Sequence, residues 1–240
     1  IGGTMIYEQD AFYDLCDELG IMVWQDFMFA NMDYPVNDEA FHQNILAEAN
    51  YQIKRLSQHA CIIFYCGNSE VEQQAAMLGI PNEMWRNDWF ANELPALIKT
   101  LHEDSLYLPS SPSEGVFPFY TSEGVTHYYG VGAYLRDVND VRRADVKFTS
   151  ETLGFSNVPE DKVISSLIHD SALWKNGVPR DTGAEWDFED VREHYTNKLF
   201  NVDINELKNK DLNRYLTLSR VATGEMMSQV FSEWRSSYSN

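Results

Sequence analysis

Residues 60–66, Ala-Cys-Ile-Ile-Phe-Tyr-Cys, limit most strongly how this chain can fold. The run is nearly all apolar, so a strand formed by it must be covered on both faces. Strands of this kind are typical of parallel sheets with helices packed on either side. The run follows residues 38–58, which have the amphipathic pattern of a long helix. The sequence therefore predicts a parallel sheet with helical connections.

Apolar runs and helical patterns alternate along the rest of the chain. Predicted helices cover residues 10–19, 38–58, 82–102 and 212–234, and predicted strands cover 21–24, 60–66, 105–108, 126–129 and 146–149. Gly20 is a natural end for the first helix. The alternation indicates an α/β fold and fits both a barrel and an open doubly wound sheet. No glycine-rich phosphate loop follows the first strand, which disfavours a nucleotide-binding fold.

Polar side chains follow three of the predicted strands. Gln25 and Asp26 follow the first, residues 68–70 follow the second, and Ser150 and Glu151 follow the last. In a (β/α)₈ barrel the carboxyl ends of the strands form the active-site face. The sequence therefore predicts a partial (β/α)₈ TIM barrel with its functional site at these strand ends.

The charge of the chain is strongly negative. It has 37 Asp and Glu against 18 Lys and Arg, a formal net charge of −19 in 240 residues. This charge repels polyanions, so we expect no nucleic-acid partner. No apolar run approaches the length of about 20 residues that a membrane-spanning helix needs, so we expect no membrane partner. A neutral substrate tolerates the acidic surface.

The cysteines match no metal-ligand spacing. Cys16, Cys61 and Cys66 are odd in number and have apolar neighbours, which predicts buried free thiols. Free thiols favour a reducing, cytoplasmic location, with a secreted or periplasmic one left open. The chain opens on Ile-Gly-Gly without Met, as if it were cut from a longer protein.

Two glutamates stand where carboxylate chemistry would be expected. Glu70 and Glu151 each end a predicted strand segment, and their separation in sequence suits two well-separated strands of one barrel. Hydrolysis of a glycosidic bond needs two carboxyl groups, one to protonate the leaving oxygen and one to attack or to activate water. From position alone, two surface glutamates that cap the following helices explain the pattern equally well.

Four blocks of the sequence resemble the β-mannosidase branch of glycoside hydrolase family 2. They are residues 6–30, 66–70 (Cys-Gly-Asn-Ser-Glu), 126–131 (Thr-His-Tyr-Tyr-Gly-Val) and 150–151 (Ser-Glu), in the order of the family. The resemblance covers roughly residues 1 to 160. It implies a retaining exo-β-glycosidase acting on terminal β-linked sugars, β-mannosides first, with Glu70 as acid/base and Glu151 as nucleophile.

The resemblance also implies a domain organisation. All 240 residues would form one catalytic barrel domain, truncated at both ends and lacking strands one and eight. The remaining strands and the preceding β-sandwich domains would belong to the rest of a longer multidomain chain. The mechanism needs a carbohydrate substrate and no metal or organic cofactor. Assembly into a homo-oligomer is left open.

Three positions depart from the family. Ser69 replaces the Asn that usually precedes the acid/base and contacts the sugar 2-hydroxyl. Gly2 stands in place of a Trp, and residues 152–155 replace an aromatic-Gly-Phe motif. All three lie near the expected sugar site. We expect Ser69 to contact the 2-hydroxyl less closely, because a hydroxyl is shorter than an amide and has one donor instead of two.

Further residues are candidates for substrate binding. Asp26 is expected to accept hydrogen bonds from sugar hydroxyls or to close a loop, and Asn68 to orient the loop around Glu70. Trp24 is a core residue or a sugar platform.

Three residues of the fourth predicted strand are also candidates. The resemblance implies that Tyr128 hydrogen-bonds the nucleophile and keeps it ionised, and that Tyr129 is a sugar-stacking wall or a packing residue. His127 is expected to be structural.

Glu70 must hold a proton near neutral pH, which partial burial and the charge of Glu151 would favour.

Other functions remain open at this point. Another family 2 activity, β-galactosidase or exo-β-glucosaminidase, fits the same two glutamates. A degenerate barrel that binds glycans without cleaving them is an alternative from a different class. The two retained carboxylates, Glu70 and Glu151, favour an enzyme.

Overall fold

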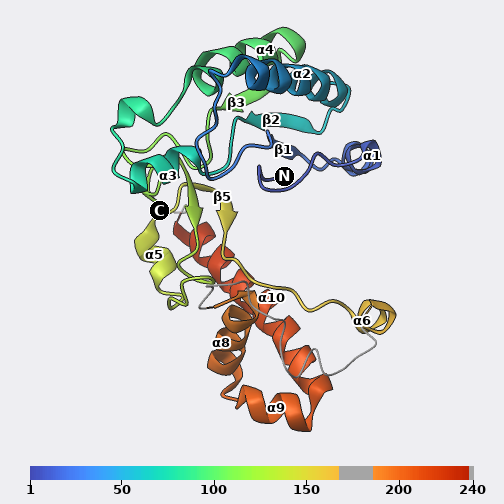
Figure 1. The fold of residues 1–240 in the computed structure, drawn as a ribbon. Helices are drawn as coiled ribbons and strands as arrows, with labels where there is room; N and C mark the ends of the chain where they lie inside the picture. The colour runs from blue at the N-terminus through green and yellow to red at the C-terminus, as the bar shows by residue number, and fades with distance from the viewer. Residues whose placement is uncertain (168–185, 238–240) are drawn as a thin grey trace. The chain divides into compact units, whose positions relative to one another are not determined.

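A computed structural model describes residues 1–167 and 186–237 (Figure 1). The chain divides into two compact units, Ile1–His127 and Tyr128–Asn240. Each has its own hydrophobic core.

The first unit contains a parallel sheet of three strands. They are β1 (Val23–Asp26), β2 (Ile62–Cys66) and β3 (Leu106–Leu108), in the spatial order β1-β2-β3. Asp26 is level with Cys66, and Cys66 with Leu108, so the carboxyl ends of the three strands lie side by side (Figure 1). The predicted parallel strands are confirmed. β2 and β3 end at the residues expected from the sequence, and β1 runs two residues further than predicted, to Asp26.

Helices α1 (Asp10–Leu19) and α2 (Glu39–Leu56) precede β1 and β2. Gly20 ends α1 in the left-handed conformation, at φ 68°, as its position predicts. Asp38 caps α2 by accepting from the Phe41 N–H. The apolar side chains of these helices enter the core of the unit, whose most deeply buried members are Tyr13, Ile53, Leu56, Tyr65, Trp89, Phe90 and Leu94.

The segment predicted as one helix over residues 82–102 is instead broken into three. It comprises η1 (Asn82–Met84), the π-helical turn η2 (Trp89–Glu93) and α4 (Leu94–Leu101). Pro95 lies in the first turn of α4, and its missing N–H prevents a regular helical ladder from continuing through this point. The sequence analysis also missed α3 (Val71–Met77), which begins directly after Glu70.

The second unit is mainly helical. It begins with Tyr128, the last residue of β4 (Val125–Tyr128), and β4 pairs with β5 (Phe148–Thr152). The helices are α5 (Asp140–Ala144), α6 (Asp161–Leu167), α8 (Phe188–Phe200), α9 (Ile204–Lys210) and α10 (Leu212–Ser237). The helix predicted over residues 212–234 is thus confirmed, and it runs slightly further as α10.

Buried charges join three helices of the second unit. Lys208 of α9 contacts Glu189 and Glu193 of α8. The Tyr215 hydroxyl of α10 lies 2.6 Å from the Glu193 carboxylate, to which it donates, and 3.1 Å from that of Glu189. These ion pairs are shielded from solvent, so each charge depends on its partners. The network fixes the packing of α8, α9 and α10.

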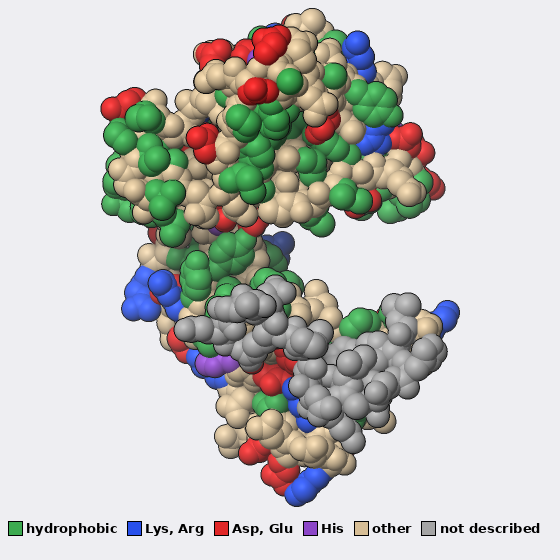
Figure 2. Space-filling model, in the orientation of Figure 1, with side chains coloured by type: hydrophobic (Ala, Val, Ile, Leu, Met, Phe, Trp, Pro, Cys, Tyr) green, Lys and Arg blue, Asp and Glu red, His purple; other side chains and the backbone are tan. Residues whose placement is uncertain are grey.

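The chain is therefore an α/β protein with parallel strands. The acidic excess lies at the surface, where Figure 2 shows acidic side chains among exposed hydrophobic ones on the first unit. Cys16, Cys61 and Cys66 are buried free thiols, as predicted. None of the described helices is long and apolar enough to cross a membrane.

Candidate active site

Glu70 lies at the carboxyl edge of the parallel sheet, four residues after the end of β2 and directly before α3. Its backbone is left-handed, at φ 63° and ψ 7°, a conformation that costs a non-glycine residue about 1 kcal/mol. The Glu70 N–H donates to the Ser111 carbonyl at 2.7 Å. This bond to the loop after β3 holds the strained residue in place, as is common for residues at functional sites.

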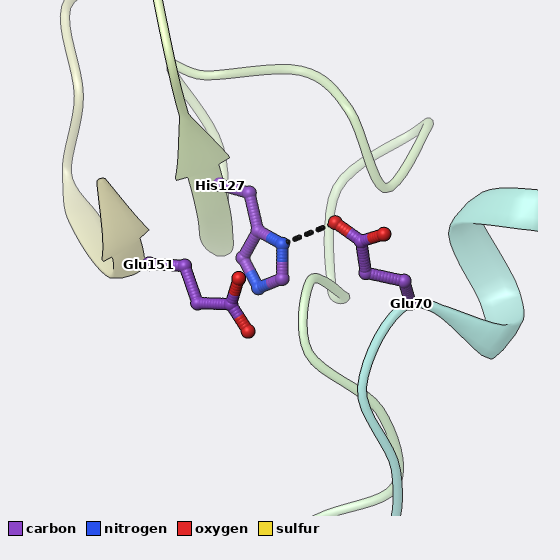
Figure 3. A group of neighbouring side chains, drawn as sticks. All are labelled: Glu70, His127 and Glu151. Atoms are coloured by element: carbon purple, nitrogen blue, oxygen red, sulfur yellow. Dashed lines mark hydrogen bonds and ion pairs between the residues drawn. The ribbon is translucent and has the colours of Figure 1, made fainter. Parts of the chain in front are cut away.

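The Glu70 carboxylate is bound by an imidazole ring (Figure 3). Nδ1 of His127 lies 2.7 Å from Oε1 of Glu70, and the His127 side chain is 1% exposed. This hydrogen bond lowers the pKa of Glu70 below its ordinary value, because it favours the charged carboxylate. Burial acts in the opposite direction but is the smaller effect.

The expectation of a proton held on Glu70 near neutral pH therefore does not fit this site as it stands. The reason is the hydrogen bond from His127, a residue that was expected to be structural. A hydrogen bond between residues 57 positions apart has no signature in the sequence.

Asn68 and Ser69 hold the loop that carries Glu70. The Asn68 amide donates to the Pro109 carbonyl at 2.9 Å and accepts from the Ser110 hydroxyl and the Val71 N–H. Asn68 is 1% exposed, so orientation of the loop is the role its contacts support. Ser69 is also buried, and its backbone extends the strand by bonding to Phe29 and Asn31. Direct contact of either side chain with a sugar stays a prediction.

Asp26 is engaged within the protein. Its Oδ2 accepts from the Gly3 N–H at 3.0 Å and its Oδ1 from the indole N–H of Trp24 at 2.7 Å, and it is 3% exposed. A side chain at Gly3 would collide with the Phe27 and Phe29 carbonyls, so glycine is required for this approach. The geometry favours the loop-closing role of Asp26, one of the two that the sequence allowed.

Trp24 is half-buried and stacks on Phe64 of the neighbouring strand. The ring centroids lie 3.9 Å apart with an interplanar angle of 11°. Because the indole face is covered by Phe64 and its N–H is bonded to Asp26, the contacts favour packing. A role as a sugar platform is untested.

In the second unit Tyr129 is one of the residues that hold Glu151. The Tyr129 hydroxyl donates a short hydrogen bond to Oε2 of Glu151, a residue of β5. The sequence analysis assigned this role to Tyr128, which was wrong. The Tyr128 hydroxyl instead donates to Asp140 at 3.1 Å and accepts from the Val131 N–H at 3.2 Å.

The correction has a simple geometric cause. Successive side chains along an extended strand point to opposite faces, so Tyr128 and Tyr129 cannot share an environment. Tyr128 is 3% exposed and lies in the core of the unit, where burial raises the pKa of its hydroxyl.

The chain is similar to β-mannosidases. β-Mannosidase B of Aspergillus flavus is 27% identical over 251 aligned positions, which cover 98% of this chain and 29% of the relative. The β-mannosidase of Rattus norvegicus is 37% identical over 147 positions, 54% of this chain and 17% of the relative.

A solved structure extends the similarity to the fold. The β-D-mannosidase of Dictyoglomus thermophilum superimposes with a TM-score of 0.78 and 32% identity, covering 98% of this chain and 28% of that chain. No protein-family model matches the sequence. The chain thus spans less than a third of the length of the relatives cited here.

Proposed function

We propose that this chain is the catalytic part of a retaining exo-β-mannosidase of glycoside hydrolase family 2. The observation that carries the proposal is the similarity to the Dictyoglomus β-D-mannosidase along 98% of the chain, in sequence and in fold. The same similarity, with the parallel order of β1, β2 and β3, supports a partial (β/α)₈ barrel. The substrate is a terminal β-linked mannoside.

In the proposed mechanism Glu151 is the nucleophile. Its carboxylate attacks the anomeric carbon and forms a covalent glycosyl-enzyme while the bond to the leaving oxygen breaks. The hydrogen bond from Tyr129 supports this role, because a donor to the carboxylate favours its charged form and fixes its direction. Direct attack requires the two catalytic carboxyl groups to lie about 5–5.5 Å apart in the working site.

Glu70 is the proposed acid/base. It donates its proton to the leaving oxygen in the first step, and as a carboxylate it removes a proton from the attacking water in the second. Its position after β2, at the carboxyl edge of the parallel sheet, supports this role, and the hydrogen bond from His127 stabilises the carboxylate that acts in the second step. Bond cleavage in the first step is helped by an acid that is strong, and water activation in the second by a carboxylate that is already charged.

A panel of nitrophenyl glycosides, assayed on the full-length protein, tests the proposal. We expect hydrolysis of the β-mannoside above that of the β-galactoside and β-glucosaminide, with the β-anomer of mannose as first product by NMR. Preference for another sugar would indicate a different glycosidase activity that uses the same mechanism. First release of the α-anomer contradicts a retaining enzyme. Binding of glycans without turnover of any substrate indicates a non-catalytic barrel.

A further inference from the structure

Three hydrogen bonds close a ring around Glu70. The Glu70 N–H donates to the Ser111 carbonyl at 2.7 Å. The Ser111 Oγ lies 3.1 Å from Nε2 of His127, and the Nδ1 of His127 lies 2.7 Å from the Glu70 carboxylate (Figure 3). Ser111 therefore holds Glu70 twice, through its own carbonyl and through the imidazole.

The chemistry of the ring fixes where its protons lie. An ionised carboxylate only accepts, so Nδ1 of His127 must carry a proton and donate it to Glu70. The other nitrogen, Nε2, then either accepts from the Ser111 hydroxyl or, in the charged ring, donates to it. Because a hydroxyl can do both, Ser111 orients the ring in either protonation state.

Burial makes these contacts strong. Ser111 is 2% exposed and the His127 side chain is 1% exposed, whereas the Glu70 side chain is 19% exposed. Water therefore does not compete within the ring, while the free edge of the carboxylate can still reach solvent or a substrate. The strained backbone of Glu70 adds to the precision with which the carboxylate is held.

We propose that Ser111 and His127 are positioning residues for the acid/base carboxyl group. The inference rests on the proposed function of Glu70. Ser111 fixes the imidazole, and the imidazole makes Glu70 a stronger acid towards the leaving group. The same hydrogen bond stabilises the carboxylate that must act as the base in the second step.

The groups around Glu70 give the direction of the effect. His127 is the principal influence that favours the charged carboxylate, with weaker hydrogen bonds from Gln73 and Gln74 of α3. Glu72 of the same helix is paired with Arg86. Removal of His127 must therefore raise the pKa of Glu70.

The pH profile of kcat/KM in the full-length protein tests this. Its basic limb reports loss of the proton from the acid, so His127→Ala should move that limb to higher pH by about one unit, as expected for one hydrogen bond to a charged group. We expect kcat to fall while KM changes little. A basic limb that stays in place or moves to lower pH would overturn the proposal.

Ser111→Ala keeps the carbonyl that binds Glu70 and removes only the hydroxyl that orients the ring. We expect a smaller shift in the same direction. Ser113→Ala is the matched control, because Ser113 is equally buried and its hydroxyl has no hydrogen-bond partner among the described residues. Equal pH profiles of kcat/KM for Ser111→Ala and Ser113→Ala would contradict the role assigned to Ser111. This comparison holds even where His127→Ala does not fold.

A second readout is independent of turnover. The difference infrared spectrum between the wild type and Glu70→Gln, recorded against pH without substrate, isolates the carboxyl band of Glu70. We expect this band to titrate at lower pH in the wild type than in His127→Ala or Ser111→Ala. If the variants shift the pH at which this band titrates but the protein cleaves no glycoside, the role of Ser111 and His127 towards Glu70 is supported and the proposed function is wrong. If mannosides are cleaved but the band does not shift, the ring has no such role.

Discussion

The two candidate glutamates are held by different kinds of group. Glu70, in the first unit, is bound by the imidazole of His127, which can carry a positive charge. Glu151, in the second unit, is bound by the hydroxyl of Tyr129, a neutral donor at ordinary pH. Glu70 also has a strained backbone, whereas Glu151 lies within the regular strand β5.

The difference matches the two roles that we propose. An acid/base must change its protonation state during each turnover, and the hydrogen bond from His127 stabilises the charged form that Glu70 needs as a base. A nucleophile must stay ionised and aimed at one carbon atom, for which a fixed neutral donor is sufficient. The contrast between the two partners therefore supports Glu70 as acid/base and Glu151 as nucleophile, and variants of each region can break or sharpen it.

Removal of the nucleophile should have the largest effect. Glu151→Ala should lower kcat on an aryl β-mannoside by on the order of 10⁴-fold or more, because the covalent intermediate can no longer form. Azide should restore turnover and give a product of inverted configuration, identified by NMR. Glu160→Ala, an exposed glutamate in the same unit, is the control. Activity that survives Glu151→Ala without azide would remove Glu151 from the mechanism.

Removal of the acid/base should have a large effect that depends on the leaving group. Glu70→Ala should lower kcat/KM on substrates with poor leaving groups by about 10²- to 10⁴-fold, the usual contribution of a general acid. The variant should retain the first step on dinitrophenyl glycosides, because their leaving group needs no proton. The exposed Glu83→Ala is the control. Equal losses on both kinds of substrate would contradict the role of Glu70 as acid.

The neighbouring tyrosines should separate function from stability. Tyr129→Phe removes the donor to Glu151 and should lower kcat by about 10- to 100-fold without loss of stability. Tyr128→Phe removes a buried hydroxyl bonded to Asp140 and Val131, and should lower the free energy of unfolding by about 1–2 kcal/mol with activity retained. Thermal unfolding and kcat, measured on both variants, check the pair. A reversed pattern would restore the role first assigned to Tyr128.

The smallest expected effect is a gain. Ser69→Asn should raise kcat/KM on a mannoside by about ten-fold, because an amide reaches further towards the 2-hydroxyl and adds about one hydrogen bond. Ser69 is buried, so a thermal unfolding curve must accompany the assay. An unchanged rate, or a lower rate in a folded variant, would separate Ser69 from sugar recognition.

The strands and their carboxyl ends could be predicted from the sequence. β2 and β3 end at Cys66 and Leu108 as predicted, and β4 ends one residue earlier than predicted. β1 and β5 run two and three residues further than predicted. These strands are short apolar runs bounded by polar residues, and such a pattern is visible in neighbouring residues of the sequence. The segment at 82–102 was harder, since Pro95 interrupts a pattern that otherwise looks like one helix.

The amino-acid sequence by itself placed Glu70 after a strand and Glu151 close to the end of another, and in the structure Glu70 lies four residues after β2 and Glu151 within β5. Only the tertiary structure decided what holds them. The bond from His127 to Glu70 joins residues 57 positions apart, and the choice of Tyr129 over Tyr128 depends on which face of the strand enters the core. Local patterns record the periodicity of a strand, whereas hydrogen bonds between distant side chains arise only once packing brings them together.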